Sequence, residues 1–500
     1  MAANAALQRL QEREMAQDLW SRTVLGFPVW PLVRLGCYRQ EALRDQPEAA
    51  AASVQLRGVA RLRAEWSTFC HSLRDLLRGS PVARASRDGR DIWVLSNTTY
   101  RRPGPDGQAP CIFASHLVEQ LGDRLLFLEF NAARLPSQGR RDLCFLDAFQ
   151  IPLLILARLA SRLWGPVFGW THRRQVAPFA PLSAGRLLDR ALYGRLMLAL
   201  GRRWLRQARP KAVFVLCGYH MHTPLQLAAR EEGIPVIELQ HGLIHESHPG
   251  YILPELPTEQ LRTLPLPDHL VVFGSYFGTM LEQESERWRG RWTVGGHPWL
   301  QQRRLAAQHS DGGGGDTPAV QGAGDPVSDD PPARTLVLFS QYELDVRRQV
   351  QAAAIAARAA LPATWTVSVK PHPREFDAES FYGPALDAGV ELIPIVSDSY
   401  ALLARVDVAV TVYSTLAIEA LAFACRSVVL PSDRWTPAIA DLVKRGLLES
   451  CANGTQLAAL ALGDRAGEVD RGDVAGTLFG IDQDPIDFDA LVMACSASST

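Results

Sequence analysis

The sequence lacks the paired cysteines that hold zinc ribbons and small disulfide scaffolds. Its eight cysteines form no Cys-x-x-Cys pair and no close cluster with histidine, which favours a reducing compartment. It also lacks an uninterrupted apolar run, because Arg158, Arg162 and Pro166 break its most apolar stretch, 151–170. The first 18 residues alternate charged and apolar side chains, unlike a signal peptide. We therefore expect a cytoplasmic chain that does not span a membrane.

Several catalytic signatures are missing as well. There is no Walker phosphate loop, no Gly-x-Gly-x-x-Gly after a predicted strand and no Gly-x-Ser-x-Gly elbow. P-loop nucleotidases, nicotinamide dehydrogenases and serine hydrolases are thus unsupported. No Asp-x-Asp metal signature lies between the predicted strands, which favours a metal-independent enzyme with no cofactor beyond an activated donor substrate.

Charge is nearly balanced over the whole chain but not along it. The net charge of -1 over 500 residues does not indicate any class of binding partner, and binding to nucleic acid is not expected. The segment 151–211, however, holds twelve Lys and Arg residues and a single acid, Asp189. Its interleaved Leu and Trp residues fit helices that lie on an anionic membrane surface, at the inner face of the cell membrane. They fit equally well helices that pack into a core and expose an Arg face.

Short apolar runs alternate with helical patterns on both sides of a Gly- and Pro-rich segment. This pattern predicts an α/β protein with two parallel sheets. The expected strands are 92–95, 125–130, 212–217, 236–239 and 270–273, then 336–339, 366–369, 390–395, 408–412 and 428–430. The expected parts are a helical extension (1–85), an acceptor domain (86–307), a flexible linker (308–333), a nucleotide-donor domain (334–462) and a solvated acidic tail (463–500). Ligands of such sheets bind beyond the carboxyl ends of the strands.

In the second half, a predicted strand runs directly into Lys370-Pro371-His372-Pro373. The two prolines fix the backbone on both sides of His372, so the ring is presented from a stiff turn. A point charge and a directional donor at a strand end suit a phosphate ester, with a surface turn as the plain alternative.

A second anion-friendly element follows about forty residues later. The strand 408–412 is followed by Tyr413, and Ser414 and Thr415 are placed to begin a helix, whose free N–H groups attract anions. Glu419 falls one turn further on the same face and could accept hydrogen bonds from a ribose. Taken singly, this pattern is also that of simple helix capping.

The first half carries a different constellation, in which a predicted strand ends in Gln240-His241-Gly242. His241 would lie exposed at a strand end, where a general base is expected, and Gly242 permits close approach of a ligand. His245, Glu246 and His248 follow in a predicted loop, where they could bind the acceptor or, less favourably, zinc. Tyr219 and His220, at the end of another strand, are expected to line the same crevice.

Five motifs in this order resemble the GT-B transferases of bacterial surface polysaccharide assembly. They are Gln240-His241-Gly242, Asp268-His269 with the following strand, Gly295-Gly296-His297-Pro298, Lys370-Pro371-His372-Pro373 and Tyr413-Ser414-Thr415 with Glu419. That group includes capsule polysaccharide transferases and CDP-glycerol glycerophosphotransferases. The resemblance implies two doubly wound Rossmann-like domains facing a central cleft, with the acceptor in the first domain and the nucleotide donor in the second.

The resemblance also implies roles for individual residues. His241 would be the base, Lys370 and His372 would hold the donor phosphate, Ser414 and Thr415 would bind phosphate oxygens, and Glu419 would bind the ribose. The implied function is transfer of a sugar from a nucleotide donor, with CMP-sugars favoured, to a glycan or lipid-linked acceptor. A glycerophosphotransferase, a sugar-nucleotide epimerase and a non-catalytic membrane-peripheral export subunit stay open. The first 200 residues match none of the motifs, so His220, His245 and Glu246 remain candidates for the base.

Overall fold

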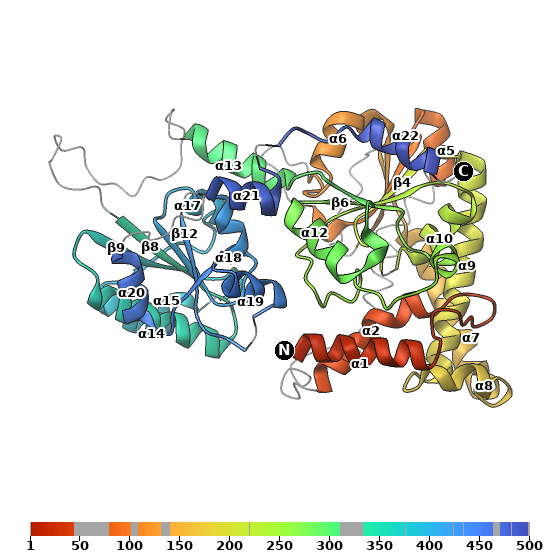
Figure 1. Ribbon diagram of the computed structural model, residues 1–500, viewed down its shortest axis with the longest axis horizontal. Coiled ribbons are helices and arrows are strands. Elements are labelled where there is room, and N and C mark those ends of the chain that lie inside the picture. Colours follow the sequence, from red (N-terminus) through yellow and green to blue (C-terminus); the bar gives the residue numbers. More distant parts are fainter. Residues whose placement is uncertain are drawn as a thin grey trace. The chain divides into compact units, whose positions relative to one another are not determined.

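The computed structural model divides the chain into two compact units. Unit 1 comprises Met1–Pro298 and Asp484–Thr500, and unit 2 comprises Trp299–Gln483. The structure describes residues 2–44, 80–101, 109–131, 141–219, 221–310, 334–375, 377–423, 425–433, 435–463, 471–481 and 483–498. The predicted site residue His220 and nearly all of the predicted linker 308–333 lie outside these ranges. Figure 1 shows the elements of each unit.

Unit 1 is built on a parallel sheet in the order β3-β2-β1-β4-β5-β6-β7. Its strands are β1 (Ile92–Asn97), β2 (Leu125–Phe130), β3 (Leu143–Phe145), β4 (Ala212–Val215), β5 (Val236–Leu239), β6 (His269–Val272) and β7 (Trp292–Val294). Strand β1 pairs with both β2 and β4, so the order of strands reverses between β1 and β4. Such a reversal opens a crevice at the carboxyl ends of these two strands.

Apolar side chains on both faces of this sheet are buried, which explains why the strands read as continuous apolar runs. Helices cover these faces, among them α6 (Ser115–Leu121), α10 (Thr223–Glu231) and α12 (Ser275–Glu284). A long hairpin, α7 (Asp147–Thr171) and α9 (Ala184–Ala208), separates β3 from β4 in sequence. The side chain of Ser183 accepts a hydrogen bond from Arg186 N and so caps α9.

The described part of the N-terminal extension forms a pair of adjacent helices, α1 (Ala2–Ala16) and α2 (Trp30–Arg44), as Figure 1 shows. A third helix, α5 (Pro81–Asp88), follows; Ser80 caps it and Pro81 occupies its first position. Leu10, Trp20 and Trp30 are buried in the same core as strands β1 and β2, so this extension is an integral part of unit 1.

The C-terminal segment differs from the predicted solvated acidic tail. Helix α21 (Arg471–Phe479) precedes the return of the chain to unit 1, where α22 (Phe488–Ser498) packs beside α6 (Figure 1). Ile486, Phe488 and Val492 are buried against the sheet side chains of β4 and β5. The buried apolar residues alternate with Asp487 and Asp489. The acidic composition of the segment therefore made this apolar face hard to recognise in the sequence.

Unit 2 is built on a second parallel sheet, in the order β10-β9-β8-β11-β12-β13. Its strands are β8 (Arg334–Phe339), β9 (Trp365–Lys370), β10 (Glu391–Leu392), β11 (Val408–Thr411), β12 (Arg426–Val429) and β13 (Glu449–Ser450). Strand β8 pairs with β9 and β11, so the order reverses between β8 and β11. Its helices include α14 (Leu344–Ala360), α19 (Pro437–Lys444) and α20 (Gly454–Leu462).

Two doubly wound parallel-sheet domains are therefore confirmed, with two differences from the sequence expectation. The predicted strand 390–395 is only two residues long, because Pro394 and an exposed stretch around Val396 follow it. The boundary between the units falls at Pro298, at the start of α13 (Pro298–Ser310), and not in the Gly-rich segment.

Candidate functional site

The candidate site residues lie beyond the carboxyl ends of strands at, or next to, the point where each sheet reverses its order. In unit 1, Tyr219 and His241 follow the carboxyl ends of β4 and β5, and Tyr100 lies just beyond β1. In unit 2, His372 follows β9, while Tyr342 and Ser414 follow β8 and β11. Each unit thus gathers polar side chains at the position where open α/β sheets bind ligands.

His241 is half-buried and has one ring nitrogen engaged. Its Nε2 lies 3.2 Å from the Tyr219 hydroxyl, and its ring is 5.5 Å from that of Tyr100. Nδ1 is shielded from solvent and has no hydrogen-bond partner among the residues that the structure describes. Burial lowers the pKa of His241 to about 4, so the imidazole is neutral at pH 7. A buried polar atom without a partner calls for an explanation, and a substrate hydroxyl would supply one.

Behind this histidine lies a carboxylate that sequence reasoning missed. Glu238 is buried within β5, and its Oε1 accepts hydrogen bonds from Gly218 N at 3.1 Å and from Tyr251 Oη at 2.9 Å. Burial raises the pKa of Glu238 to about 7, although these two hydrogen bonds act to lower it. A charged residue inside an otherwise apolar strand, Val-Ile-Glu-Leu, was the signal that could have revealed it.

Tyr219 links Glu238 to His241 through aromatic packing. Its ring meets that of Tyr251 edge-on at 5.5 Å and that of His248 at 5.2 Å. Gly250 allows this arrangement, because a Cβ there would lie 2.3 Å from the Tyr219 ring. The phenol that contacts His241 is therefore held in place by the loop that follows β5.

Gln240 and Gly242 have positioning contacts. The Gln240 Oε1 accepts a hydrogen bond from Phe273 N at 2.7 Å, and its Nε2 donates to Gly242 O at 2.8 Å. These bonds join the ends of β5 and β6 and fix the turn that carries His241. Gln240 is fully buried, so its predicted role as an acceptor-lining residue gives way to that of a brace, while Gly242 is exposed.

The two further histidines of this loop lie close together. His245 and His248 are 5.3 Å apart by ring centroids, and both are partly buried. The His245 Nδ1 accepts a hydrogen bond from Ser247 N at 3.3 Å, and the His248 Nδ1 accepts one from Gly250 N at 3.1 Å. Burial lowers the pKa of His245 to about 4 and that of His248 well below its usual value. These bonds shape the loop, and Glu246 is part-exposed within it.

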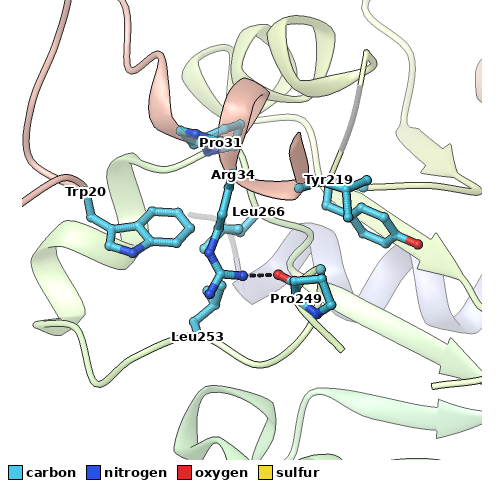
Figure 2. Close-up of a pocket in the computed structure, with 11 residues that line it drawn as sticks. Trp20, Pro31, Arg34, Tyr219, Pro249, Leu253 and Leu266 are labelled. Carbon is cyan, nitrogen blue, oxygen red and sulfur yellow. Dashed lines mark hydrogen bonds between the residues drawn. The ribbon is translucent and has the colours of Figure 1, made fainter. Parts of the chain in front are cut away.

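The loop is clamped from the N-terminal extension, as Figure 2 shows. Arg34 of α2 is buried and donates to the carbonyl oxygens of Pro249 and, at 3.1 Å, of Ile252. Its charge is balanced by buried Glu14, which lies 2.5 Å from Arg34 Nε and also accepts a hydrogen bond from Trp30 Nε1 at 2.8 Å. This contact between the extension and the histidine loop could not be predicted from the sequence, because its partners are distant in the chain.

A small cavity lies beside this clamp, with Arg34, Trp20 and Tyr219 in its wall (Figure 2). Its volume of about 20 Å³ is that of a single water molecule. The cavity is therefore too small for a sugar or a nucleotide, and it does not represent the substrate site.

In unit 2, His372 is presented from a stiff turn, as its flanking prolines predict. Its Nδ1 accepts a hydrogen bond from Arg374 N at 3.2 Å, which leaves the ring proton on Nε2 when the imidazole is neutral. Partial burial lowers the pKa of His372, although Glu375 nearby acts to raise it. Its ring is 5.3 Å from that of Tyr342, a half-exposed aromatic residue at the end of β8. His372 thus offers an N–H donor beside an aromatic face.

Lys370 is placed differently from the sequence expectation. Its side chain is buried, and Nζ donates to Pro371 O at 3.1 Å and to Ile395 O at 2.8 Å. Burial lowers the pKa of Lys370, while Glu375 and Asp398 act in the opposite direction. Two of its three donor positions are thus used to tie β9 to the segment after β10, which leaves one for a phosphate.

A buried polar network that sequence reasoning missed supports the His372 turn. The Glu375 Oε1 accepts a hydrogen bond from His372 N at 2.6 Å, and Oε2 accepts one from Tyr382 Oη at 3.0 Å. Tyr382 Oη also lies 2.6 Å from Ser340 Oγ, just beyond β8, and Arg347 pairs with Glu375 at 2.9 Å. Glu375 is fully buried, so the turn is anchored to two strand ends by charge-assisted bonds.

The Ser414 and Thr415 element is shorter than predicted. Helix α18 spans only Leu416–Glu419 and continues as a 3-10 turn, so its dipole is weak. The Ser414 Oγ accepts a hydrogen bond from Leu416 N at 3.2 Å, and Thr415 is exposed. Glu419 accepts a hydrogen bond from Tyr400 Oη at 2.7 Å, and burial raises its pKa. The three side chains do lie together at the end of β11.

Metal-ligating side chains do not converge in the described ranges, where no group of three or more His, Cys, Asp or Glu residues could hold a metal ion. The histidines of the unit 1 loop are instead engaged through ring packing and backbone bonds.

Three solved structures illustrate the similarity in fold. UDP-GlcNAc 2-epimerase of Neisseria meningitidis, solved with UDP-GlcNAc, is 10% identical, with a TM-score of 0.46, over 82% of this chain and 99% of its own. MurG of Acinetobacter baumannii is 13% identical, with a TM-score of 0.40, over 81% and 99%. The wall teichoic acid polymerase TagF is 9% identical, with a TM-score of 0.39, over 88% and 97%.

No family model matches the chain, and no curated protein does. With identities of 9 to 13% to these three structures, the chemistry of this chain has to be argued from its own residues.

Proposed function

We propose that the protein is a metal-independent glycosyltransferase that moves a sugar from a nucleotide donor to a glycan or lipid-linked acceptor of a surface polysaccharide. The observation that carries this proposal is His241. It is a neutral imidazole at the carboxyl end of a strand, with Nε2 in contact with Tyr219 and Nδ1 buried without a hydrogen-bond partner among the described residues. That arrangement suits a base that takes a proton from a substrate hydroxyl.

In the proposed reaction, the acceptor oxygen forms a bond to the anomeric carbon of the donor sugar while the bond from that carbon to the phosphate oxygen breaks. In the tautomer that carries its proton on Nε2, His241 donates to the Tyr219 oxygen, and the acceptor proton passes to Nδ1. The low pKa of His241 keeps the ring in its proton-accepting form.

In unit 2, the leaving phosphate gains negative charge as the bond breaks. His372 Nε2–H is fixed as a donor by the hydrogen bond that Nδ1 accepts. The remaining Lys370 proton lies at the end of β9, and the hydroxyls of Ser414 and Thr415 follow β11, the strands on either side of β8. Preorganised donors of this kind stabilise a leaving oxyanion without a metal ion. Glu419 would bind a ribose hydroxyl of the donor.

Binding of the donor is tested by thermal shift with CMP, CDP, UDP, GDP and TDP. One nucleotide should raise the melting midpoint of the wild type but not that of His372→Ala, because a ligand that binds only the folded state stabilises it by an amount that rises with affinity. Glu391→Ala, an exposed residue of β10, serves as the matched control in unit 2. A CMP response supports the sugar-transferase assignment, and a CDP response favours a glycerophosphotransferase. An unchanged shift in His372→Ala would contradict the site.

Catalysis is tested separately with His241→Ala. This variant should keep the nucleotide shift and lose transfer to an acceptor by about 10²- to 10⁴-fold, the usual contribution of a general base. The control is His269→Ala, since His269 lies at the opposite end of neighbouring β6. Conversion of the donor sugar without any acceptor would identify an epimerase and overturn the transferase proposal.

A further inference from the structure

Helix α7 exposes a continuous apolar stripe. Five of its large apolar residues recur at intervals of three and four, and Trp164 lies next to them. The stripe consists of Leu156, Leu159, Leu163, Trp164, Val167 and Trp170. Trp170 is 80% exposed and Leu163 74%. Six of the fifteen large apolar residues that are exposed in the described part of the chain thus lie on this one helix. A soluble surface rarely carries such a patch without a partner.

The opposite side of α7 is fixed to unit 1. Leu154, Ala157 and Phe168 are buried in the core, and α7 lies along α9 (Figure 1). A Cβ on Gly165 would lie 3.1 Å from the Cα of Gly185, and one on Gly169 would lie 2.9 Å from the Cβ of Ala184. The two helices therefore approach closely enough to be locked together, and the stripe cannot turn inward without breaking that contact.

Among the described helices, α7 alone is long and apolar enough to cross a membrane, in spite of the interruptions at Arg158, Arg162 and Pro166. However, 33% of its most apolar window is buried within the protein. To span a membrane, α7 would have to separate from α9 and remove its buried side chains from the core of unit 1. The packing instead suits a helix that lies along a surface with one face embedded.

The charge around the stripe has a single sign. The sequence contains no acid between Asp147 and Asp189. Arg162 on α7 and Arg173 and Arg174 on α8 (Arg173–Val176) are exposed, and no ion pair is found for them within the described residues. A protein partner would meet this rim with a matched set of acids, whereas a sheet of anionic headgroups meets it at every position, with tryptophans suited to the boundary layer.

We propose that the α7 stripe and its arginine rim dock unit 1 onto an anionic lipid surface, with α7 parallel to the membrane. The stripe from Leu156 to Trp170 is about 20 Å long at 1.5 Å per residue, which is enough for a shallow, in-plane insertion. Such docking corresponds to the membrane-surface interpretation of the basic segment 151–211 and does not depend on the transferase activity.

Flotation of the full-length protein with vesicles tests this docking. The wild type should float with 70:30 phosphatidylcholine:phosphatidylglycerol and not with phosphatidylcholine alone, and high salt should weaken binding. Leu163→Glu/Trp170→Glu should reduce binding by at least about tenfold. Arg162→Glu/Arg174→Glu should remove the preference for phosphatidylglycerol. Met493→Glu, which alters another exposed apolar residue of unit 1, should float like the wild type.

Two results would overturn the proposal. One is a wild type that does not float with either vesicle. The other is a wild-type dimer in light scattering that Leu163→Glu/Trp170→Glu converts to a monomer, because the stripe would then be an interface between copies. The melting midpoint of each variant is measured alongside. Since all five substituted side chains are exposed, it should stay at the wild-type value.

Discussion

Arg34 and Pro249 are separated by 215 positions in sequence and meet through a hydrogen bond from the Arg34 guanidinium to the Pro249 carbonyl. This contact joins the N-terminal helices to the loop that carries the histidines of unit 1. Because the guanidinium and Glu14 are both buried, the contact depends on a charge pair that water does not screen.

We expect Arg34→Met to cost about 3–5 kcal/mol of unfolding free energy, because it leaves the Glu14 carboxylate buried without its counter-charge. Chemical denaturation measures this loss. Arg206→Met is the matched control, since the exposed Arg206–Glu232 pair should contribute no more than about 1 kcal/mol. The double variant Glu14→Gln/Arg34→Met should recover part of the loss. A single variant as stable as the control would show that the clamp is unimportant.

Tyr382→Phe should weaken the support of the His372 turn. The substitution removes the hydroxyl that donates to Glu375 and contacts Ser340, at a cost of about 1–3 kcal/mol for the buried groups left unpaired. It should also lower the affinity for the nucleotide that stabilises the wild type, as measured by calorimetry. Tyr342→Phe removes a hydroxyl from a half-exposed ring and should leave stability unchanged. Equal affinity in all three proteins would argue against a positioning role for Tyr382.

Gly218→Ala should displace the buried carboxylate behind His241. An added Cβ would lie 2.5 Å from Glu238 Oε2, so either the strand end or the carboxylate has to move, at a cost of about 1–3 kcal/mol. Gly242→Ala provides the comparison, because a Cβ there meets nothing within 4 Å. Thermal melts of the two variants should therefore diverge, and similar midpoints would contradict the close packing at Gly218.

Stability should rise between about pH 4 and pH 6.5. His241, His245 and His297 have pKa values lowered to about 4 by burial, so over this range the unfolded chain binds more protons than the folded one. Each histidine contributes a slope of up to about 1.4 kcal/mol per pH unit. Glu238, with its pKa raised to about 7, opposes this trend above about pH 4.5.

The variant His245→Asn isolates one of these histidines. Asn can accept the Ser247 N–H bond in place of the ring nitrogen but does not titrate. Denaturation curves from pH 4 to 7 should show a shallower rise than the wild type. A slope that does not change would mean that His245 is not buried as described.

The sequence predicted the two sheets well because their strands are buried on both faces and so appear as short apolar runs. The position of the motifs at strand ends could be predicted as well, because the carboxyl ends of parallel strands lie at the same edge of a sheet. The supporting contacts could not be predicted, because Glu14, Arg34 and Pro249 come together only through tertiary packing. The expected availability of Lys370 for a phosphate was only partly right. A sequence shows the cation but not the two backbone carbonyl groups that accept hydrogen bonds from it.

In sequence, the two segments of unit 1 flank unit 2. Helix α22 is therefore synthesised after all of unit 2, although it packs into the core against β4 and β5 of unit 1. During translation, the side of the unit 1 sheet that carries Phe214 and Ile237 therefore lacks the cover of α22 until residues 484–498 emerge. Helix α22 lies far from His241 and His372 in sequence. Its removal would nevertheless expose an apolar surface of unit 1 and leave the chain prone to aggregation.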